Sequence, residues 1–199
     1  MARVRGNTYG DRLVKTSFSD PLRIAVVTAG PKFGRIGITF CPGKYDPEGG
    51  KYDGGVWWDR DLPVDLDAIS DWGAAAVVTL LGSEELTLLR VEDLGREIQR
   101  REIEWFHLPI VDVSIPDERF EQEWKGAGKK LRKILSEGGA VLVHCRGGLG
   151  RAGTIAARLL VELGIAPTKA IANVRAVRPG AIETREQEEF VMSMNATLE

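Results

Sequence analysis

Val141-Leu-Val-His-Cys-Arg-Gly-Gly-Leu-Gly-Arg-Ala-Gly-Thr154 is the most informative stretch of this sequence of 199 residues. Its first residues are apolar and β-branched, as in a buried strand, and the residues from Arg151 onward have the pattern of a helix. A short strand-to-helix turn points successive backbone N–H groups at one spot, close to the positive end of the helix dipole. The backbone can also approach a ligand closely there, because the turn holds three glycines, Gly147, Gly148 and Gly150. The stretch therefore predicts an anion-binding loop.

Two side chains give this loop its chemistry: Cys145 before it and Arg151 at its end, with five residues between them. The helix dipole and Arg151 would stabilise a thiolate at Cys145, and the thiolate is the nucleophilic form of cysteine. The guanidinium of Arg151 can bind a phosphoryl group through two hydrogen bonds, which suits the oxygens better than a lysine would. The spacing predicts a nucleophilic cysteine at a phosphate-binding loop.

Outward from this loop, apolar runs alternate with helical patterns. Strands are expected at residues 22–29, 75–81, 103–110 and 140–144. Helices are expected at residues 65–72, 83–101, 117–137, 151–163, 167–177 and 184–194, with Ser83 as the cap of the second one. This alternation predicts an α/β fold, in which a central, mostly parallel sheet has helices on both faces. Ligands of such folds bind outside the carboxyl ends of the strands.

The first third of the chain is less regular. Residues 1–20 are polar and mildly basic, and we expect a loose N-terminal arm there, followed by a single domain over residues 21–199. Residues 30–63 are rich in glycine and proline, which predicts two short strands with long loops.

Composition argues against several classes of protein. The 27 basic and 29 acidic residues give a net charge of −2, so no general attraction to nucleic acid or to an anionic membrane is expected. No stretch approaches the roughly 20 apolar residues of a membrane span, and the first residues lack the pattern of a signal peptide. The two cysteines cannot form a disulfide framework and suit a reducing compartment, which predicts a cytoplasmic protein. Two histidines and two cysteines are too few for a zinc site, and no metal or cofactor is expected.

The string from His144 to Arg151 resembles the signature of cysteine-dependent protein tyrosine and dual-specificity phosphatases, and it is most similar to the cyclin-dependent kinase inhibitor 3 branch, also called kinase-associated phosphatase. Three further segments resemble that branch in the right order. They are residues 40–44 (Phe-Cys-Pro-Gly-Lys), residues 109–117 (Pro-Ile-Val-Asp-Val-Ser-Ile-Pro-Asp), similar to its general-acid loop, and residues 178–187 (Arg-Pro-Gly-Ala-Ile-Glu-Thr-Arg-Glu-Gln). The resemblance covers roughly residues 37–195.

The resemblance implies a mechanism and a set of site residues. Cys145 would attack phosphorus and form a phosphocysteine, and Asp112 would protonate the leaving oxygen and then activate water. His144 would orient the loop, and Gln187 would orient the hydrolytic water. The phosphoryl oxygens would be held by the backbone of Arg146, Gly147, Gly148, Leu149 and Gly150 and by Arg151. The implied substrate is a phosphorylated protein carrying phosphotyrosine, with phosphoserine and phosphothreonine as further substrates, rather than a polyphosphorylated lipid.

Alternatives remain open at several of these positions. Asp117 is the second candidate for the acid, although it equally suits the cap of a helix. Cys41 is either a small buried apolar residue or the partner of Cys145 in a regulatory disulfide. Arg178 either touches the substrate phosphate or is a solvated surface residue.

Two departures from the family pattern bear on activity. Ala152 stands where a serine or threonine usually follows the arginine and helps the thiolate to leave, so a slow second step is expected. Thr154 lies about 200° further round the helix and should not substitute for that hydroxyl. Glu183 stands where the kinase-associated branch has glutamine. A catalytically weak phosphoprotein-binding module is therefore the first alternative function, and another thiol enzyme with an anion-binding loop, a sulfurtransferase or an arsenate reductase, is the second.

Overall fold

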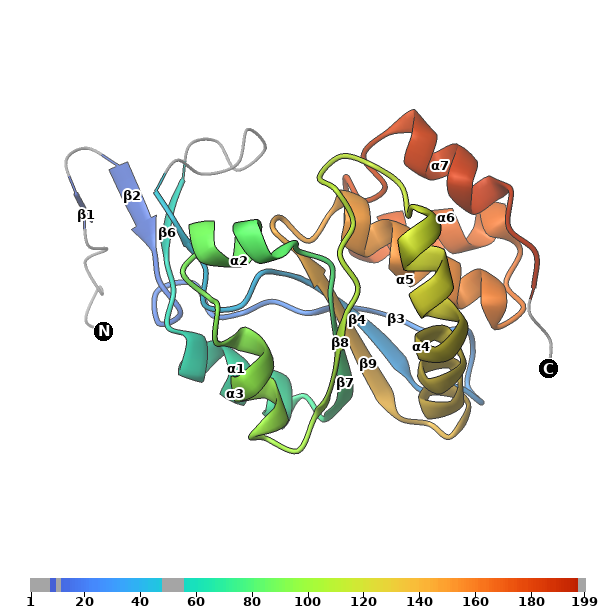
Figure 1. Cartoon of the computed structure of the whole chain (residues 1–199), viewed down its shortest axis with the longest axis horizontal. Helices are drawn as coiled ribbons and strands as arrows, with labels where there is room; N and C mark the ends of the chain where they lie inside the picture. The colour runs from blue at the N-terminus through green and yellow to red at the C-terminus, as the bar shows by residue number, and fades with distance from the viewer. Residues whose placement is uncertain (1–7, 10–11, 48–55, 197–199) are drawn as a thin grey trace.

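A five-stranded sheet forms the centre of the computed structural model, which describes residues 8–9, 12–47 and 56–196 (Figure 1). Its strands lie in the order β3 (Ala25–Val27), β4 (Arg35–Phe40), β9 (Ala140–Cys145), β7 (Ala74–Thr79) and β8 (Glu104–His107). β3 runs antiparallel to β4, and the other neighbours are parallel. The predicted α/β fold with a mostly parallel central sheet is confirmed.

Helices cover both faces of this sheet, as Figure 1 shows. One face packs against α1 (Leu62–Asp71), α2 (Ser83–Leu88) and α3 (Leu94–Gln99), and the other against α4 (Glu118–Ser136), α5 (Gly150–Glu162), α6 (Pro167–Val177) and α7 (Arg185–Met192). The central strand β9 is buried at every position because alternate side chains enter different cores. In β9, Val141 and Val143 join the core under α4–α7, whereas Leu142 joins the core under α1–α3.

Helix α5, which carries the sequence motif, is buried along its whole length. Its two charged residues beyond the motif are paired, since an unpaired buried charge would be strongly destabilising. Arg158 Nε lies 2.8 Å from Glu162 Oε1, and the same oxygen accepts a hydrogen bond from Trp124 Nε1 of α4 at 2.8 Å. Arg132 of α4 also pairs with Glu162. These contacts fix α5 against α4 and so hold the loop at its start.

The N-terminal part of the chain differs from the sequence-based expectation. The predicted loose arm is a paired strand over part of its length: β2 (Arg12–Lys15) runs parallel to β6 (Trp57–Asp59) and antiparallel to β1 (Thr8–Tyr9), with β5 (Tyr45–Asp46) beyond β6. The described part of residues 30–63 holds three strands, β4, β5 and β6, where two were predicted. Residues 1–7 and 10–11 of the predicted arm lie outside the described residues.

Residues 40–44, which resemble a segment of the kinase-associated branch, are anchored to α1. The carboxylate of Asp65 accepts two hydrogen bonds from Arg60, at 2.7 and 2.8 Å, and one from the backbone N–H of Gly43, at 2.8 Å. Helix α1 starts three residues earlier than predicted, since Asp61 accepts a hydrogen bond from the backbone N–H of Val64 and caps it. The capped helix therefore holds the segment that follows β4.

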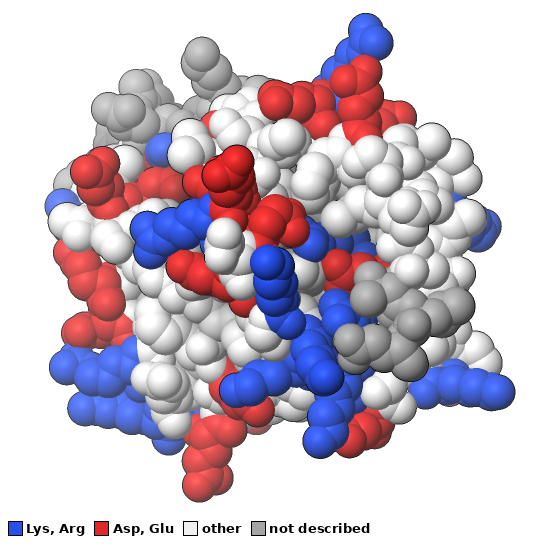
Figure 2. Space-filling view, turned by 45° about the vertical axis from the view of Figure 1, so that its right-hand side comes forward, with Lys and Arg blue, Asp and Glu red and all other residues white. Residues whose placement is uncertain are grey.

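The carboxyl ends of the parallel strands β4, β9, β7 and β8 meet at one edge of the sheet. The motif loop, the segment after Phe40, helix α2 and residues 108–117 all leave the sheet there. On the face shown in Figure 2, acidic and basic side chains are interspersed across much of the surface. Among the described residues, no helix combines the length and apolar character that crossing a bilayer requires.

Candidate active site

The loop after β9 holds Cys145 by contacts within the motif itself. Cys145 is buried, and the backbone N–H of Gly148 donates to its Sγ at 3.3 Å. Gly148 has a φ of +69° and packs on the neighbouring strand, where an added Cβ would lie 2.6 Å from the backbone nitrogen of Phe40. A residue with a side chain would therefore be strained and would clash at this position. The sulfur therefore accepts a hydrogen bond from the backbone of its own loop.

The outer side of the loop is held by Arg178, which lies between α6 and α7. Its Nε and Nη2 donate to the carbonyl oxygens of Gly148 and Gly147, at 3.0 and 2.9 Å. With the carbonyls turned outward to Arg178, the loop's peptide groups are free to direct N–H groups inward. Leu149 occupies the N-cap position of α5, and its carbonyl accepts from Gly153 at 2.8 Å. Arg178 thus binds the loop backbone.

Arg151 is almost fully buried at the start of α5, and a carboxylate fixes its direction. Its Nη1 and Nη2 donate to Oε2 and Oε1 of Glu85 at 2.8 and 2.9 Å, and Nη1 also donates to the carbonyl of Ile110 at 3.0 Å. Burial opposes the positive charge, but the hydrogen bonds to Glu85 and the nearby Cys145 keep the pKa of Arg151 above its ordinary value. Nε of Arg151 is buried and has no partner among the described residues, so a donor remains for a ligand oxygen.

Glu85 lies at the candidate site, and sequence reasoning did not find it. It lies in the first turn of α2 and accepts a hydrogen bond from the backbone N–H of Gly82 at 3.0 Å. The cap position is therefore Gly82, and the prediction of Ser83 as the cap is wrong, because Ser83 is the first helical residue and the Glu85 carboxylate supplies the acceptor. The same carboxylate reaches across the sheet edge to Arg151, a contact over 66 positions that no local pattern reveals.

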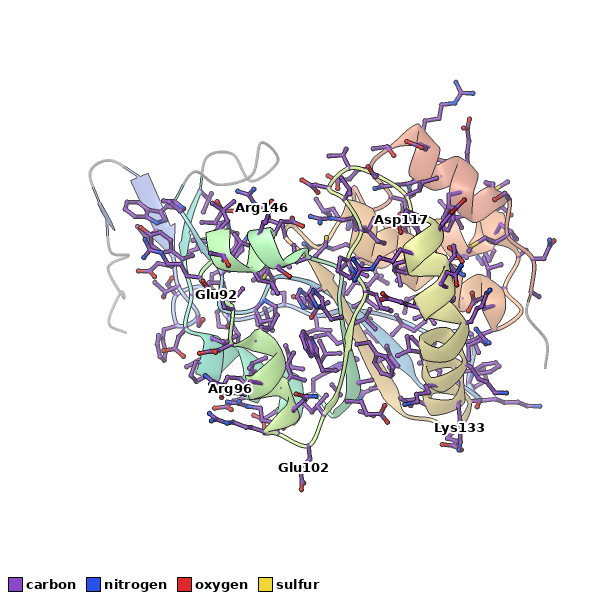
Figure 3. The ribbon with its side chains drawn as sticks, viewed as in Figure 1. Glu92, Arg96, Glu102, Asp117, Lys133 and Arg146 are labelled. Atoms are coloured by element: carbon purple, nitrogen blue, oxygen red, sulfur yellow. The ribbon has the colours of Figure 1, made fainter. Side chains whose placement is uncertain are left out.

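The two candidate acids have different places in the structure. Asp112 lies on the loop after β8, and its Oδ1 is 2.8 Å from Arg151 Nη2, with 60% of its side chain exposed. Asp117 instead accepts a hydrogen bond from the backbone N–H of Phe120 at 2.8 Å and caps α4. Figure 3 labels Asp117 at the first turn of that helix. The structure therefore brings Asp112 to the loop and uses Asp117 as a helix cap.

The side chain of Arg146 points to a neighbouring strand. Its Nη2 and Nε bind Oδ1 and Oδ2 of Asp46, in β5, at 2.9 and 3.1 Å. The hydrogen bonds to Asp46 raise the pKa of Arg146. Its carbonyl accepts from the backbone N–H of Cys41 at 3.3 Å, which ties the loop to the segment after β4. The backbone of Arg146, and not its side chain, is therefore placed to bind a phosphoryl group in the loop. Asp46 is a second residue that the sequence did not reveal.

His144 lies beneath the loop and is fully buried. Its Nε2 is 2.8 Å from Oγ1 of Thr79 in β7, and Trp105 Nε1 donates to that same hydroxyl at 2.9 Å. Burial lowers the pKa of His144 to about 3, so the ring is neutral at ordinary pH. A neutral, hydrogen-bonded ring at the end of β9 suits the predicted role of orienting the loop.

Gln187 connects two segments that face the loop. Its side-chain oxygen accepts from the backbone N–H of Glu183 at 3.0 Å, and its Nε2 donates to the carbonyl of Ser114 at 3.2 Å. An added Cβ on Gly150 would lie 3.0 Å from the Gln187 oxygen, which places this amide at the loop. The amide therefore holds the Asp112 loop against the start of α7.

The hydroxyl missing at Ala152 is not supplied from elsewhere on the helix. Ala152 is fully buried, and Thr154 donates from Oγ1 to the carbonyl of Gly150 at 2.8 Å. The Thr154 hydroxyl is therefore used within the helix. Cys41, the other thiol, is free and buried, and burial raises its pKa above the ordinary value. It follows Phe40, whose Cα pairs with that of Cys145 across the sheet.

A cleft of about 590 Å³ opens beside these groups, between α2, the Asp112 loop and the start of α4. Its walls combine apolar and charged residues, which are Pro109, Ile110, Val111, Phe120, Glu84, Glu85, Asp112, Asp117, Arg119, Glu123 and Arg146 among others. Figure 3 labels Arg146 beside α2. The cleft is large enough for an aromatic side chain together with part of a peptide.

A buried cysteine at the end of a parallel strand, a glycine loop, an arginine opening a helix and an aspartate on the facing loop together define the class of cysteine-dependent phosphatases. The comparisons agree with this class. The family model described as "PTP-SAK: Swiss Army Knife protein, DSP-PTPase phosphatase domain" matches residues 60–191. The chain belongs to this family, as the resemblance predicted.

Individual relatives and solved structures are similar over parts or most of the chain. Cyclin-dependent kinase inhibitor 3 of Rattus norvegicus is 33% identical over 135 residues, which cover 66% of this chain. The chain thus spans 62% of the length of that curated relative. Tyrosine-protein phosphatase CDC14 of Candida albicans is 32% identical over 94 residues, covering 47% of this chain and 17% of that protein. The crystal structure of kinase associated phosphatase with its catalytic-site cysteine replaced by serine has a TM-score of 0.73 at 26% identity, covering 86% of this chain and 93% of that one.

Proposed function

We propose that this chain is a phosphoprotein phosphatase that acts through a phosphocysteine on Cys145. One observation carries the proposal: three groups with complementary chemistry meet at one sheet edge. The Gly148 N–H lies 3.3 Å from Cys145 Sγ, and Arg151, which opens the helix after the loop, lies 2.8 Å from Asp112. A nucleophile, an oxyanion-binding guanidinium and a carboxyl group are the parts that phosphoryl transfer through a thiol needs.

The first step transfers the phosphoryl group to sulfur. The thiolate of Cys145 attacks phosphorus, the S–P bond forms, and the bond from phosphorus to the leaving oxygen breaks. Arg151 and the loop N–H groups stabilise the charge on the phosphoryl oxygens. Asp112, in its protonated form, gives its proton to the leaving oxygen, so that an alcohol departs. Substrate binding therefore exchanges the Asp112–Arg151 contact for contacts of both residues with the substrate.

The second step returns the thiolate. Water attacks the phosphocysteine, Asp112 accepts one of its protons, and the S–P bond breaks to release inorganic phosphate. Ala152 gives no hydroxyl to the departing sulfur, and Thr154 bonds Gly150 instead. This second step is accordingly the slow one in the proposed cycle.

The proposed substrate is a phosphorylated protein, with phosphotyrosine first and phosphoserine or phosphothreonine as further substrates. The cleft supports a peptide, because apolar residues such as Pro109 and Phe120 lie beside carboxylates. A tyrosine ring can pack on the former while the backbone of the peptide lies along the open rim. Both thiols are free, which supports a reducing compartment, and we propose a cytoplasmic location.

The lack of a hydroxyl at Ala152 favours one second candidate, a phosphoprotein-binding module. Such a protein would hold a phosphoryl group on the loop and release it unchanged. The two candidates share every contact of the site and differ in whether Cys145 forms a bond to phosphorus. A kinetic test on the first turnover therefore separates them.

The test is a rapid-quench time course with an aryl phosphate at excess over enzyme. We expect a burst of about one phenol per enzyme, followed by slow turnover, because phosphocysteine accumulates when its hydrolysis is slow. Cys145→Ser should give neither phase. Cys41→Ala is the matched control, since it removes the other thiol and should keep the burst.

No burst and no turnover in the wild type, with binding of inorganic phosphate intact, would overturn the phosphatase proposal and support the binding module. A burst retained by Cys145→Ser would exclude Cys145 as the nucleophile.

A further inference from the structure

The backbone N–H of Gly150, in the loop that would hold phosphate, donates to a carboxylate of this same chain. Its acceptor is Glu183 Oε2, at 2.6 Å, a short distance for a hydrogen bond to a charged oxygen. Gly150 opens α5, so the carboxylate also lies at the positive end of the helix dipole. An added Cβ on Gly150 would collide with Glu183, so glycine at this position leaves the room that the carboxylate occupies.

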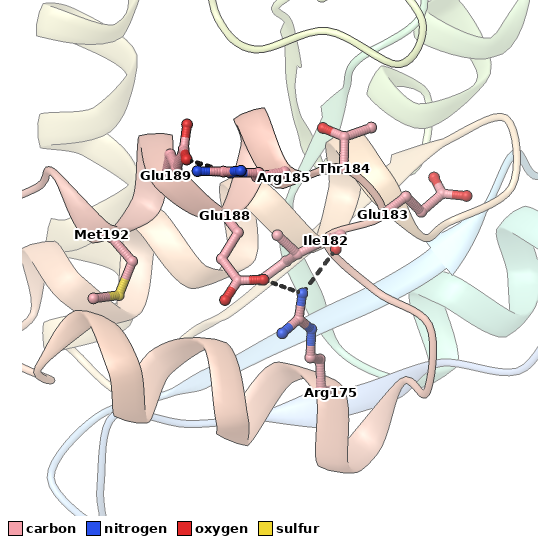
Figure 4. A pocket seen from close by; sticks show the side chains of 8 residues that line it. All are labelled: Arg175, Ile182, Glu183, Thr184, Arg185, Glu188, Glu189 and Met192. Atoms are coloured by element: carbon pink, nitrogen blue, oxygen red, sulfur yellow. Dashed lines mark hydrogen bonds and ion pairs between the residues drawn. The ribbon is translucent and has the colours of Figure 1, made fainter.

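The segment that carries Glu183 is held in a strained conformation. Ile182, directly before it, has a φ of +60°, which a β-branched residue adopts rarely. Arg175 of α6 fixes this backbone by donating to the carbonyls of Ala181 and Ile182 at 3.1 and 3.0 Å. Figure 4 shows Arg175 bound to Ile182 and Glu188, with the Glu183 side chain directed away from that pair. The strained turn thus directs Glu183 toward the loop.

We propose that Glu183 is a displaceable anion built into the phosphate loop: its carboxylate takes the place of a phosphoryl oxygen on the Gly150 N–H, and substrate must expel it in order to bind. This proposal rests on the proposed function, because it assigns a competitor to the same loop. Glu183 is exposed to solvent despite this contact, so its side chain can swing out without disturbing the core. The displaced carboxylate would leave the strained turn in place beside the mouth of the site.

The competing explanation is that Glu183 is merely a cap of α5. A cap and a competitor make the same contact but respond differently to an oxyanion. Removing a cap lowers stability and leaves phosphate binding unchanged. Removing a competitor strengthens phosphate binding, because one N–H is set free and one negative charge leaves the neighbourhood of the bound dianion.

The experiment is isothermal titration of inorganic phosphate into the wild type, Glu183→Gln and Glu186→Gln at fixed pH and salt. Glu183→Gln should bind phosphate about tenfold more tightly, since a neutral amide competes less for the Gly150 N–H than a carboxylate does. Glu186→Gln removes the same charge from an exposed site in the first turn of α7 and should bind within about twofold of the wild type. Glu183→Ala is the second variant and should also bind more tightly.

A measurement on the wild type alone complements the variants. The side-chain carboxyl carbon of Glu183, labelled with carbon-13, should shift on addition of phosphate as it leaves the Gly150 N–H.

Equal or weaker binding of phosphate by Glu183→Gln, with the wild type binding normally, would overturn the proposal, and so would a carboxyl resonance that phosphate does not move. If neither the wild type nor the variants bind phosphate, the proposed function itself is overturned, and the two failures are thereby distinguished.

Discussion

The phosphate loop, residues 145–151, is made of consecutive residues, whereas the carboxylates that face it come from three distant segments. Gly148 donates to Cys145 three positions away, and Arg151 follows from the same turn. Glu85, Asp112 and Glu183 reach the loop over 66, 39 and 33 positions. The anion-binding loop is therefore local in sequence. The carboxylates that face it, which the proposals assign to proton transfer and to competition with phosphate, are not.

The loop and the facing segments also differ in how their backbones are held. In the loop, the positive φ falls on a glycine, Gly148, where it costs little. In the facing segments it falls on β-branched residues, with φ +63° at Val113 beside Asp112 and +60° at Ile182 beside Glu183. Strain of this kind costs about 1–3 kcal/mol per residue and is retained where the surroundings impose it. Asp112 and Glu183 are therefore positioned by tertiary contacts that act against the local backbone preference.

The largest expected effect tests whether the facing segments take part in the chemistry. Asp112→Asn should lower kcat on a phosphorylated peptide by about 100-fold or more, because the leaving oxygen loses its proton donor. The matched variant Asp117→Asn should stay within about twofold, since asparagine caps a helix as well as aspartate does. Steady-state kinetics measure both. A larger loss in Asp117→Asn than in Asp112→Asn would reverse the assignment.

The next effect concerns His144, which lies beneath the loop, and the dependence of folding stability on pH. Burial lowers the pKa of His144 to about 3, from 6.5 in an exposed histidine, so between these pH values the unfolded state binds a proton that the folded state does not. Stability should therefore fall as pH drops from 6.5 toward 3, by about 1.4 kcal/mol per pH unit from this residue. Urea unfolding of wild type and His144→Gln across this range measures the difference in slope.

His144→Gln is itself less stable at every pH, so the slope and not the absolute stability carries the test. Equal slopes in the two proteins would show that the His144 ring takes up a proton as readily in the folded state as in the unfolded state. The ring beneath the loop would then not be neutral, as proposed.

A smaller effect is expected at Glu85, which acts through Arg151. Glu85→Gln should raise KM about tenfold with a smaller change in kcat, because a neutral amide replaces the carboxylate that fixes the guanidinium with two charge-assisted hydrogen bonds. Glu92→Gln, an exposed carboxylate outside the cleft, is the control and should change KM by less than about twofold. Equal effects of the two variants would mean that Glu85 contributes only charge.

The smallest effect is expected in the loop helix, at Ala152. Ala152→Ser should speed the slow phase after the burst by about three- to tenfold, since a hydroxyl would donate to the departing thiolate. Rapid-quench kinetics should show a lower burst and a faster second phase. Ala156→Ser buries a hydroxyl one turn further along α5 and serves as the control. A second phase unchanged by Ala152→Ser would show that the missing hydroxyl does not limit turnover.

Pattern alone predicted much of the fold. Apolar runs and helical patterns identified most elements within a few residues of their bounds, and α6 was predicted at its observed bounds, residues 167–177. The single helix predicted over residues 83–101 is wrong, because the chain forms two shorter helices there, α2 and α3. Errors fell where local signals are weak. The N-terminal strands were missed because β2 is stabilised by pairing with β6, more than 40 residues away. Their short runs carry no periodicity of their own.

The phosphate loop follows from its local sequence, since glycines, cysteine and arginine at fixed spacing specify a strand-to-helix turn through backbone sterics and the helix dipole. The tertiary structure alone decided which charged groups meet that loop. It placed Arg146 against Asp46 and brought Glu85, Asp112 and Glu183 to one sheet edge. Steric preferences act between neighbours in sequence. Ion pairs between distant segments depend instead on which strand ends the fold places side by side.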